Sequence, residues 1–311
     1  MIRVALIIVF AISLPLILKA SDQLFYLSFA SRILITALAA TSLNLVLGYG
    51  GMVSFGHAAF VGTGAYVASI ALAEGISSAW IGWPAAVLAS GLTALIVGAI
   101  SLRTRGVYFI MITLAFAQMM YYLVNSMKAY GGDEGLTLPA RAGLGFGLDL
   151  GDEVTFYYVV LFLLSISLYS FSRLIHSRFG RALMAIRENE ARAEALGFPT
   201  LRYKLIAFAI AGAAGGLAGA LLASHGKYVN PNVLHWTQSG TLMVMVILGG
   251  VATVWGGLVG AAVLLLLQEV LGAYTEHWEF WTGWVLLAVI LFARRGLVGV
   301  LATLRERRRR S

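Results

Sequence analysis

Residues 42–66 read SLNLVLGYGGMVSFGHAAFVGTGAY, an apolar stretch with six glycines between Gly48 and Gly64. Glycine lets a backbone leave the helical path and lets a neighbouring helix approach closely. Irregular backbone at membrane depth occurs only where protein buries it or where it lines a wet cavity. The stretch therefore predicts either a broken helix beside a solute pathway or a site of close helix packing alone. Asn44, Ser54 and His57 are its candidate pathway residues, and the alternative is that they cap freed backbone groups.

The composition of the whole chain is that of an integral membrane protein. Of its 311 residues, 60% are hydrophobic and 12% are charged, whereas a soluble domain carries about 25% charged residues. This excludes a soluble enzyme, a nucleic-acid-binding domain and a disordered chain. The chain has no cysteine, which excludes disulfides and thiolate metal sites.

Long apolar segments predict an all-α, polytopic transmembrane bundle that forms a single domain over residues 1–311. About 20 apolar residues are needed to cross the hydrocarbon as a helix. Ten candidate spans meet or approach this length, and the count falls to eight if 239–272 is a re-entrant pair instead of two spans. The candidates are 4–18, 28–47, 54–73, 83–101, 106–127, 156–172, 204–223, 239–254, 256–272 and 280–293.

The distribution of cations predicts that both termini are cytoplasmic. With that orientation, 17 of the 22 Lys and Arg residues lie inside, four lie outside, and Arg32 lies near an outer span end. Cytoplasmic loops carry the excess of positive charge, and residues 294–311 form a basic cytoplasmic tail that suits anionic membrane lipid. The inner set is Arg3, Arg103, Arg105, Arg173, Arg178, Arg181, Arg187, Arg192, Arg202, Lys204, Arg294, Arg295, Arg305 and Arg307–Arg310.

A second glycine-rich region lies in the other half of the chain. Three pairs have the GxxxG spacing at which membrane helices approach closely, namely Gly212/Gly216, Gly215/Gly219 and Gly256/Gly260. One glycine-broken region in each half is typical of transporters with related halves and a pathway between them.

Residues 173–204 form the longest predicted cytoplasmic segment and contain an amphipathic helical pattern. Leu183, Ile186, Ala193 and Leu196 recur at helical spacing, and Gly197 supplies a stop signal. The segment is predicted either to lie on the membrane surface or to insert these apolar side chains into a protein groove. The acidic residues Glu188, Glu190 and Glu194 favour the groove, because anionic lipid would repel them.

Several motifs are absent from the sequence. The phosphate-binding pattern GxxxxGK[ST] does not occur, so no ATP site is expected on this chain. Carboxylates are nearly missing from the middle of the candidate spans, and Glu269 is the nearest. Proton-coupled carriers usually place such groups within the membrane, so a self-powered carrier is disfavoured.

The chain resembles the M-type membrane subunit of branched-chain amino acid ABC importers over roughly residues 30–295. The resemblance rests on motifs that occur in the same order. They are SLNL at 42–45, GYGG at 48–51, SFGHAAF at 54–60, RGVYF at 105–109, GRALMAIRENE at 180–190, ALG at 195–197 and GG at 249–250.

This resemblance implies an importer permease in a bacterial cytoplasmic membrane. Its partners would be a related H-type permease subunit, two ATPase subunits that bind ATP-Mg, and an extracytoplasmic solute-binding protein; this chain would bind no cofactor and no nucleic acid. Residues 173–204 would be the coupling loop, with Arg192 where the family pattern prefers a second alanine. Its expected coupling residues are Leu183, Ile186, Glu190, Ala191, Glu194, Ala195 and Gly197.

Two other functions remain open on the sequence. A permease of the same family could carry urea, short amides or other amino acids. An ion-coupled carrier or a channel would need no ATPase subunit.

Overall fold

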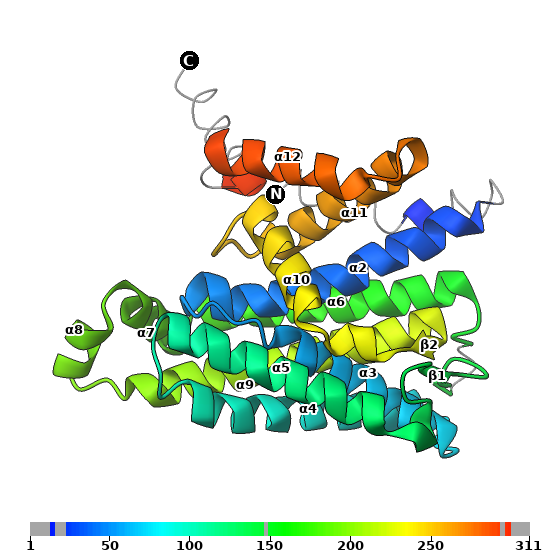
Figure 1. The fold of residues 1–311 in the computed structure, drawn as a ribbon, viewed down its shortest axis with the longest axis horizontal. Helices are drawn as coiled ribbons and strands as arrows, with labels where there is room; N and C mark the ends of the chain where they lie inside the picture. Colours follow the sequence, from blue (N-terminus) through cyan, green and yellow to red (C-terminus); the bar gives the residue numbers. More distant parts are fainter. Residues whose placement is uncertain (1–12, 16–22, 146–148, 293–295, 300–311) are drawn as a thin grey trace.

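The computed structural model describes residues 13–15, 23–145, 149–292 and 296–299. The prediction of an all-α polytopic bundle is confirmed (Figure 1). Its α-helices are α2 (Leu24–Asn44), α3 (His57–Ala73), α4 (Ala79–Ser101), α5 (Val107–Ser126), α6 (Glu153–His176), α7 (Arg178–Glu188), α8 (Glu190–Ala195), α9 (Thr200–Gly226), α10 (Trp236–Gly249), α11 (Gly256–Tyr274) and α12 (Trp278–Phe292). The predicted span 4–18 and tail 294–311 lie almost entirely outside the described residues.

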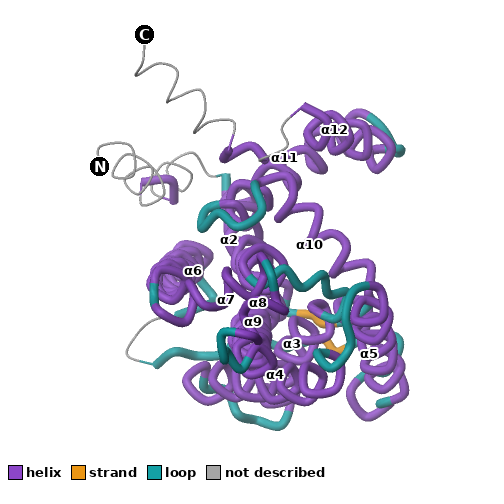
Figure 2. The backbone as a smooth tube through the Cα atoms, turned by 90° about the vertical axis from the view of Figure 1, so that its left-hand side faces the viewer, coloured by secondary structure: helices purple, strands orange, loops and turns teal. Residues whose placement is uncertain are grey.

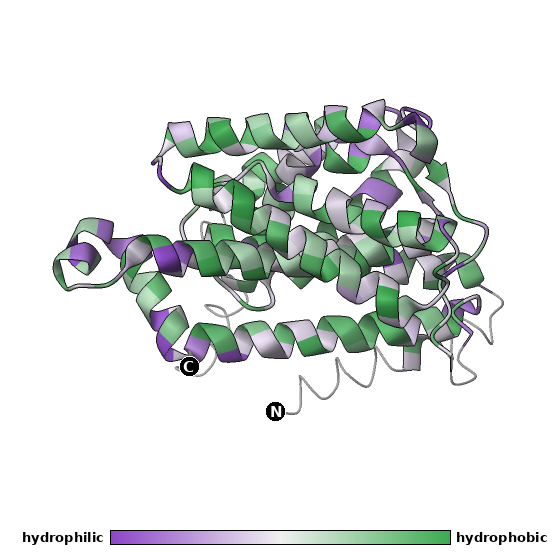
Figure 3. Cartoon of the chain, turned by 90° about the horizontal axis from the view of Figure 1, so that it is seen from below, coloured by the Kyte–Doolittle hydropathy of each residue, from purple (hydrophilic) through white to green (hydrophobic). Residues whose placement is uncertain are grey.

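The long helices run along one axis, and the connecting segments gather at its two ends. Strands β1 (Leu136–Thr137) and β2 (Tyr228–Val229) pair antiparallel at one end, and α7 and α8 lie at the other (Figure 1). Hydrophobic residues line the long helices, and many hydrophilic residues gather near the two ends (Figure 3). The segments predicted to be cytoplasmic around Arg105 and in 177–199 share the α8 end, where Arg105 pairs with α8.

Six helices within the described part of the chain are long and apolar enough to cross a membrane. They are α2 with the π-helical turn that extends it to Tyr49, α4, α5, α6, α9 and α11. Helices α3 and α10 have 17 and 14 residues. At about 1.5 Å per residue, neither reaches across a hydrocarbon layer of about 30 Å. The predicted pair 239–272 is therefore one short helix and one long helix.

Helix α9 packs inside the bundle against α3 and α4, as the end-on view in Figure 2 shows. The backbones of α3 and α9 touch, because a Cβ atom at Gly64 would overlap the backbone of Gly216 and one at Gly219 would overlap the carbonyl of Val61. Between α10 and α11, a Cβ at Gly260 would overlap the carbonyl of Met245. The predicted close approach at the GxxxG pairs is confirmed.

A buried arginine holds the long loop at the β1–β2 end. Arg141 donates from Nε to the carbonyl of Ser224 at 3.1 Å and from Nη1 to the carbonyl of Leu150 at 3.0 Å. It also pairs with Glu153 and lies 4.3 Å above the centre of the Phe156 ring. This clamp joins the loop to the ends of α6 and α9.

Candidate functional site

The first glycine-rich region is a true break in the helix. The π-helical turn ends at Tyr49, and the chain is non-helical until α3 begins at His57. Gly51 has φ +67°, and a Cβ there would lie 2.7 Å from Cγ of Arg187 in α7. The break therefore starts at the α7–α8 end and returns into the bundle.

Two hydroxyl groups on other helices, those of Thr113 and Ser239, bond backbone groups that the break leaves free. The Phe55 amide donates to Oγ1 of Thr113 at 3.2 Å. Ser239, at the start of α10, donates to the carbonyl of Phe55 at 2.7 Å and accepts from the Ala58 amide at 2.8 Å. A buried backbone group without a partner is costly, so these contacts fix the break against α5 and α10. A single Ser or Thr within an apolar span forms no recognisable sequence pattern, so the sequence did not indicate Thr113 or Ser239.

The break brings two short helices together inside the bundle. Helix α3 starts at His57 and runs to the β1–β2 end, whereas α10 starts beside it and runs to Gly249 near the opposite end. A Cβ at Gly62 would overlap the Leu234 side chain, which precedes α10. The two short helices therefore begin at similar depth and point in opposite directions.

The candidate pathway residues Asn44, Ser54 and His57 are at most 1% exposed in this chain. Asn44 donates to the carbonyl of Thr253 at 2.7 Å and accepts from the Ala252 amide at 3.0 Å, which secures the α10–α11 turn. His57 bonds Oγ of Ser42 at 2.8 Å, and Ser54 accepts from the Gly56 amide at 3.2 Å. None of the three lines either of the two cavities described below, of about 670 and 10 Å³. The alternative role as caps for freed backbone fits the contacts of Asn44 and Ser54.

A cavity of about 670 Å³ lies beside the start of α3 and α10. Solute sites in proteins have volumes of about 300–1,000 Å³, so this cavity is large enough for a small solute. Its wall is formed by α2, α3, α9, α10 and α11, the segment 230–233 and the beginning of α12. Ala58 and Val61 of the first glycine-rich region contribute to it.

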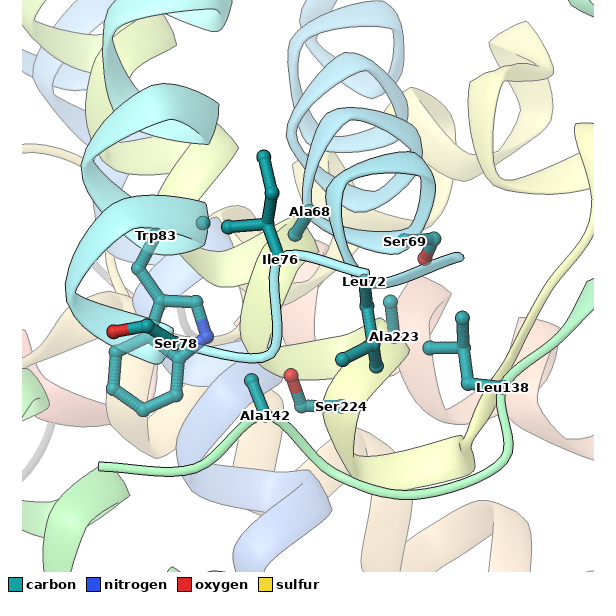
Figure 4. Close-up of a pocket in the computed structure, with 11 residues that line it drawn as sticks. Ala68, Ser69, Leu72, Ile76, Ser78, Trp83, Leu138, Ala142, Ala223 and Ser224 are labelled. Carbon is teal, nitrogen blue, oxygen red and sulfur yellow. The ribbon is translucent and has the colours of Figure 1, made fainter. Parts of the chain in front are cut away.

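A second pocket, shown in Figure 4, lies between α3, α4, α9 and the loop at 138–142. Its volume is about 10 Å³, which is about the space that one water molecule requires. It is too small for an organic solute.

Helix α7 packs against the bundle through the residues that were expected to contact a partner. Leu183 and Ile186 are 0% and 2% exposed, and Ala193 of α8 is 3% exposed. Leu183 belongs to a core cluster with Tyr49 and Phe208. These three apolar side chains therefore fill the interior of this chain, whereas Leu196, the fourth residue of the amphipathic pattern, is exposed.

Helix α8 is held by ion pairs from two directions. A carboxylate oxygen of Glu190 lies 2.6 Å from Nζ of Lys204 in α9, and its other oxygen lies 3.7 Å from Nε of Arg105. Glu194 lies 3.2 Å from Nη2 of Arg105 and accepts from Oγ1 of Thr200 at 3.0 Å. Two of the three glutamates expected to suit a partner's groove, Glu190 and Glu194, thus bind the α4–α5 loop and the start of α9.

The opposite side of α8 is open. Ala191, Ala195, Leu196, Gly197 and Phe198 are exposed, and the side chain of Leu196 is 71% exposed. Asn189 separates α7 from α8 and caps α8 by accepting from the Arg192 amide at 2.9 Å. Gly197 has φ +83° and ends the element, as predicted. Figure 1 shows α8 projecting beyond the bundle.

Residues 25–294 match the family described as "Branched-chain amino acid transport system / permease component". The chain is 28% identical to the high-affinity branched-chain amino acid permease LivM of Salmonella typhimurium, over 86% of this chain and 69% of that protein. LivM of Escherichia coli matches to the same extent. The L-arabinose permease AraH of Azospirillum brasilense is 27% identical over 78% of this chain and 72% of that protein. No solved structure matches the chain significantly.

Proposed function

Since the chain belongs to the family of permease components of branched-chain amino acid transport systems, we propose that it is the membrane subunit of an importer for these amino acids. Separate ATPase subunits drive this importer, a related H-type subunit completes the membrane core, and an extracytoplasmic protein delivers the solute. This chain is a non-enzymatic ABC-type permease, and it spans a bacterial cytoplasmic membrane with both termini inside.

The observation that carries this proposal is the construction of α8. A permease without a phosphate-binding loop must receive work through a contact with another protein. Helix α8 projects from the bundle, presents Ala195, Leu196 and Phe198 outward, and is joined through Glu190 to α9 and the α4–α5 loop. A force on α8 is therefore passed to long helices, whereas a surface helix on lipid needs no such connection.

The substrate class rests on the relatives. Branched-chain amino acid transport is named for the family and for both LivM proteins. The arabinose permease covers a similar share of this chain, so other solutes of the same family, including urea and short amides, are the second candidates.

Co-purification with site-specific cross-linking tests the coupling. The chain has no cysteine, so Leu196→Cys provides a single attachment point on α8. The expected result is a stable complex with the ATPase subunits in which this cysteine cross-links to an ATPase subunit. The matched control is Ser126→Cys, which is exposed at the β1–β2 end of α5 and should give no such product.

An ion-coupled carrier or a channel predicts a different outcome. Such a protein would purify without ATPase subunits and would give no cross-link from Leu196→Cys. That result would contradict the importer assignment.

A further inference from the structure

On α2 and α11, the residues that line the 670 Å³ cavity change from polar near the β1–β2 end to apolar further inside. Along α2, Arg32, Ile35, Thr36 and Ala39 face it from a single side of the helix. Arg32 is the member nearest the β1–β2 end, and Ala39 is the deepest. Helix α11 has the same order, with Gln268 nearer that end and Leu265 deeper.

The polar mouth combines opposite charges with amide groups. Arg32 and Glu279 both line it, together with Asn230, Asn232 and Gln268. Among the described residues, the Arg32 guanidinium and the Glu279 carboxylate form no hydrogen bond or ion pair with another side chain. A cation and an anion that remain available at one cavity mouth can receive the two charges of a zwitterion.

Further inside, apolar side chains from several helices line the cavity beside Thr237, Gln238 and Thr241 of α10. Ile35, Val61, Leu242, Met245 and Leu265 all line the cavity. Immediately beyond Ala58, Ser239 ties the start of α3 to the start of α10. The cavity continues past this junction along α10, where Leu242 and Met245 line it.

We propose that this cavity is a binding site for a zwitterionic amino acid with an aliphatic side chain. Arg32 receives the carboxylate, Glu279 receives the ammonium group, and the side chain lies against Ile35, Val61 and Leu265. The inference rests on the proposed function and deepens it, because it places solute selection within this chain as well as in a delivery protein.

A cysteine placed in the cavity tests binding without requiring transport. Thr241 lines the cavity, and its hydroxyl bonds only its own helix, at the carbonyl of Thr237. In the assembled complex, Thr241→Cys should react with a small water-soluble thiol reagent, and L-leucine should slow that reaction. Ser126→Cys, outside the cavity, should react at the same rate with and without leucine.

The two charges are tested with analogues and variants. Leucinamide lacks the carboxylate, and 4-methylpentanoate lacks the ammonium group, so neither should protect Thr241→Cys as leucine does. Arg32→Gln and Glu279→Gln should each weaken protection by leucine about tenfold or more, as loss of a charge-assisted hydrogen bond implies. Glu269→Gln changes a carboxylate on α11 that does not line the cavity and should leave protection unchanged.

Equal reaction rates of Thr241→Cys with and without leucine would overturn the inference, as would full protection in both charge variants. The experiment also distinguishes failure of the proposed import function from failure of the proposed binding site. Protection by leucine in a complex that imports no leucine would contradict the import assignment and leave the site standing. ATP-driven import without protection would contradict the site alone.

Discussion

Glu190 and Lys204 are joined at 2.6 Å, which ties the first residue of α8 to the first turn and a half of α9. Both side chains are largely shielded, at 23% and 14% exposed. Helix α9 in turn packs against α3 and α4 through glycine contacts. The pair therefore joins the projecting element directly to a helix at the centre of the bundle.

We expect Lys204→Glu to uncouple ATP hydrolysis from solute uptake, because it places two carboxylates together where α8 meets α9. The swapped double variant Glu190→Lys/Lys204→Glu should restore most of the uptake. Interaction energies between contacting charges are about 0.5–3 kcal/mol in double-mutant cycles, so a recovery of several-fold is expected. The measurement is uptake per ATP hydrolysed in vesicles that contain the whole complex.

Glu188→Lys is the matched control, since Glu188 is exposed and forms no ion pair among the described residues. If Lys204→Glu and this control give the same uptake per ATP hydrolysed, the ion pair has no role in coupling.

Gly197 should tolerate asparagine far better than valine. Its φ of +83° is strained for a branched side chain, although a Cβ there would meet nothing within 4 Å. Gly197→Val should therefore distort the end of α8 and weaken ATPase association, at a cost of about 1–3 kcal/mol, while the bundle remains folded. Pull-down of the ATPase subunits measures this effect, and equal association of both variants would refute it.

Ser239→Ala should destabilise the bundle, because it leaves the Phe55 carbonyl and the Ala58 amide without their partner. Loss of hydrogen bonds to buried groups costs about 1–3 kcal/mol each. The expected result is a lower melting temperature of the detergent-solubilised protein. Ser165→Ala, on α6, removes only a bond within one helix at an exposed position and should leave the melting temperature nearly unchanged; an equal shift in both would contradict the role given to Ser239.

Gly64→Leu should prevent α3 and α9 from packing, because the added side chain would overlap the backbone of Gly216. Overpacking of a well-packed interior costs about 1–3 kcal/mol or more, so the amount of folded protein in the membrane should fall. Gly272→Leu adds the same bulk to α11 where a Cβ would meet nothing within 4 Å. Similar yields of the two variants would refute the close approach of α3 and α9.

The sequence predicted correctly those features that depend on residues close together in the chain. Gly197 ends α8 because of its own backbone, and the GxxxG pairs mark close approach because small residues recur on one helix face. The burial of Leu183 was not predicted, since an amphipathic face looks the same whether it packs on its own chain or on a partner. The ion pairs of Arg105 involve residues 85 and 89 positions further along the chain. A local sequence pattern cannot predict contacts between residues so far apart in the chain.

The central claim is tested most directly by uptake of labelled leucine into vesicles that contain this chain and its proposed partners, namely an H-type subunit, ATPase subunits and a binding protein. Ionophores collapse every ion gradient, and ATP is supplied on the side of α8. The account predicts leucine accumulation that requires ATP hydrolysis and is unaffected by the ionophores. Accumulation that persists without ATP and disappears with the ionophores would contradict it.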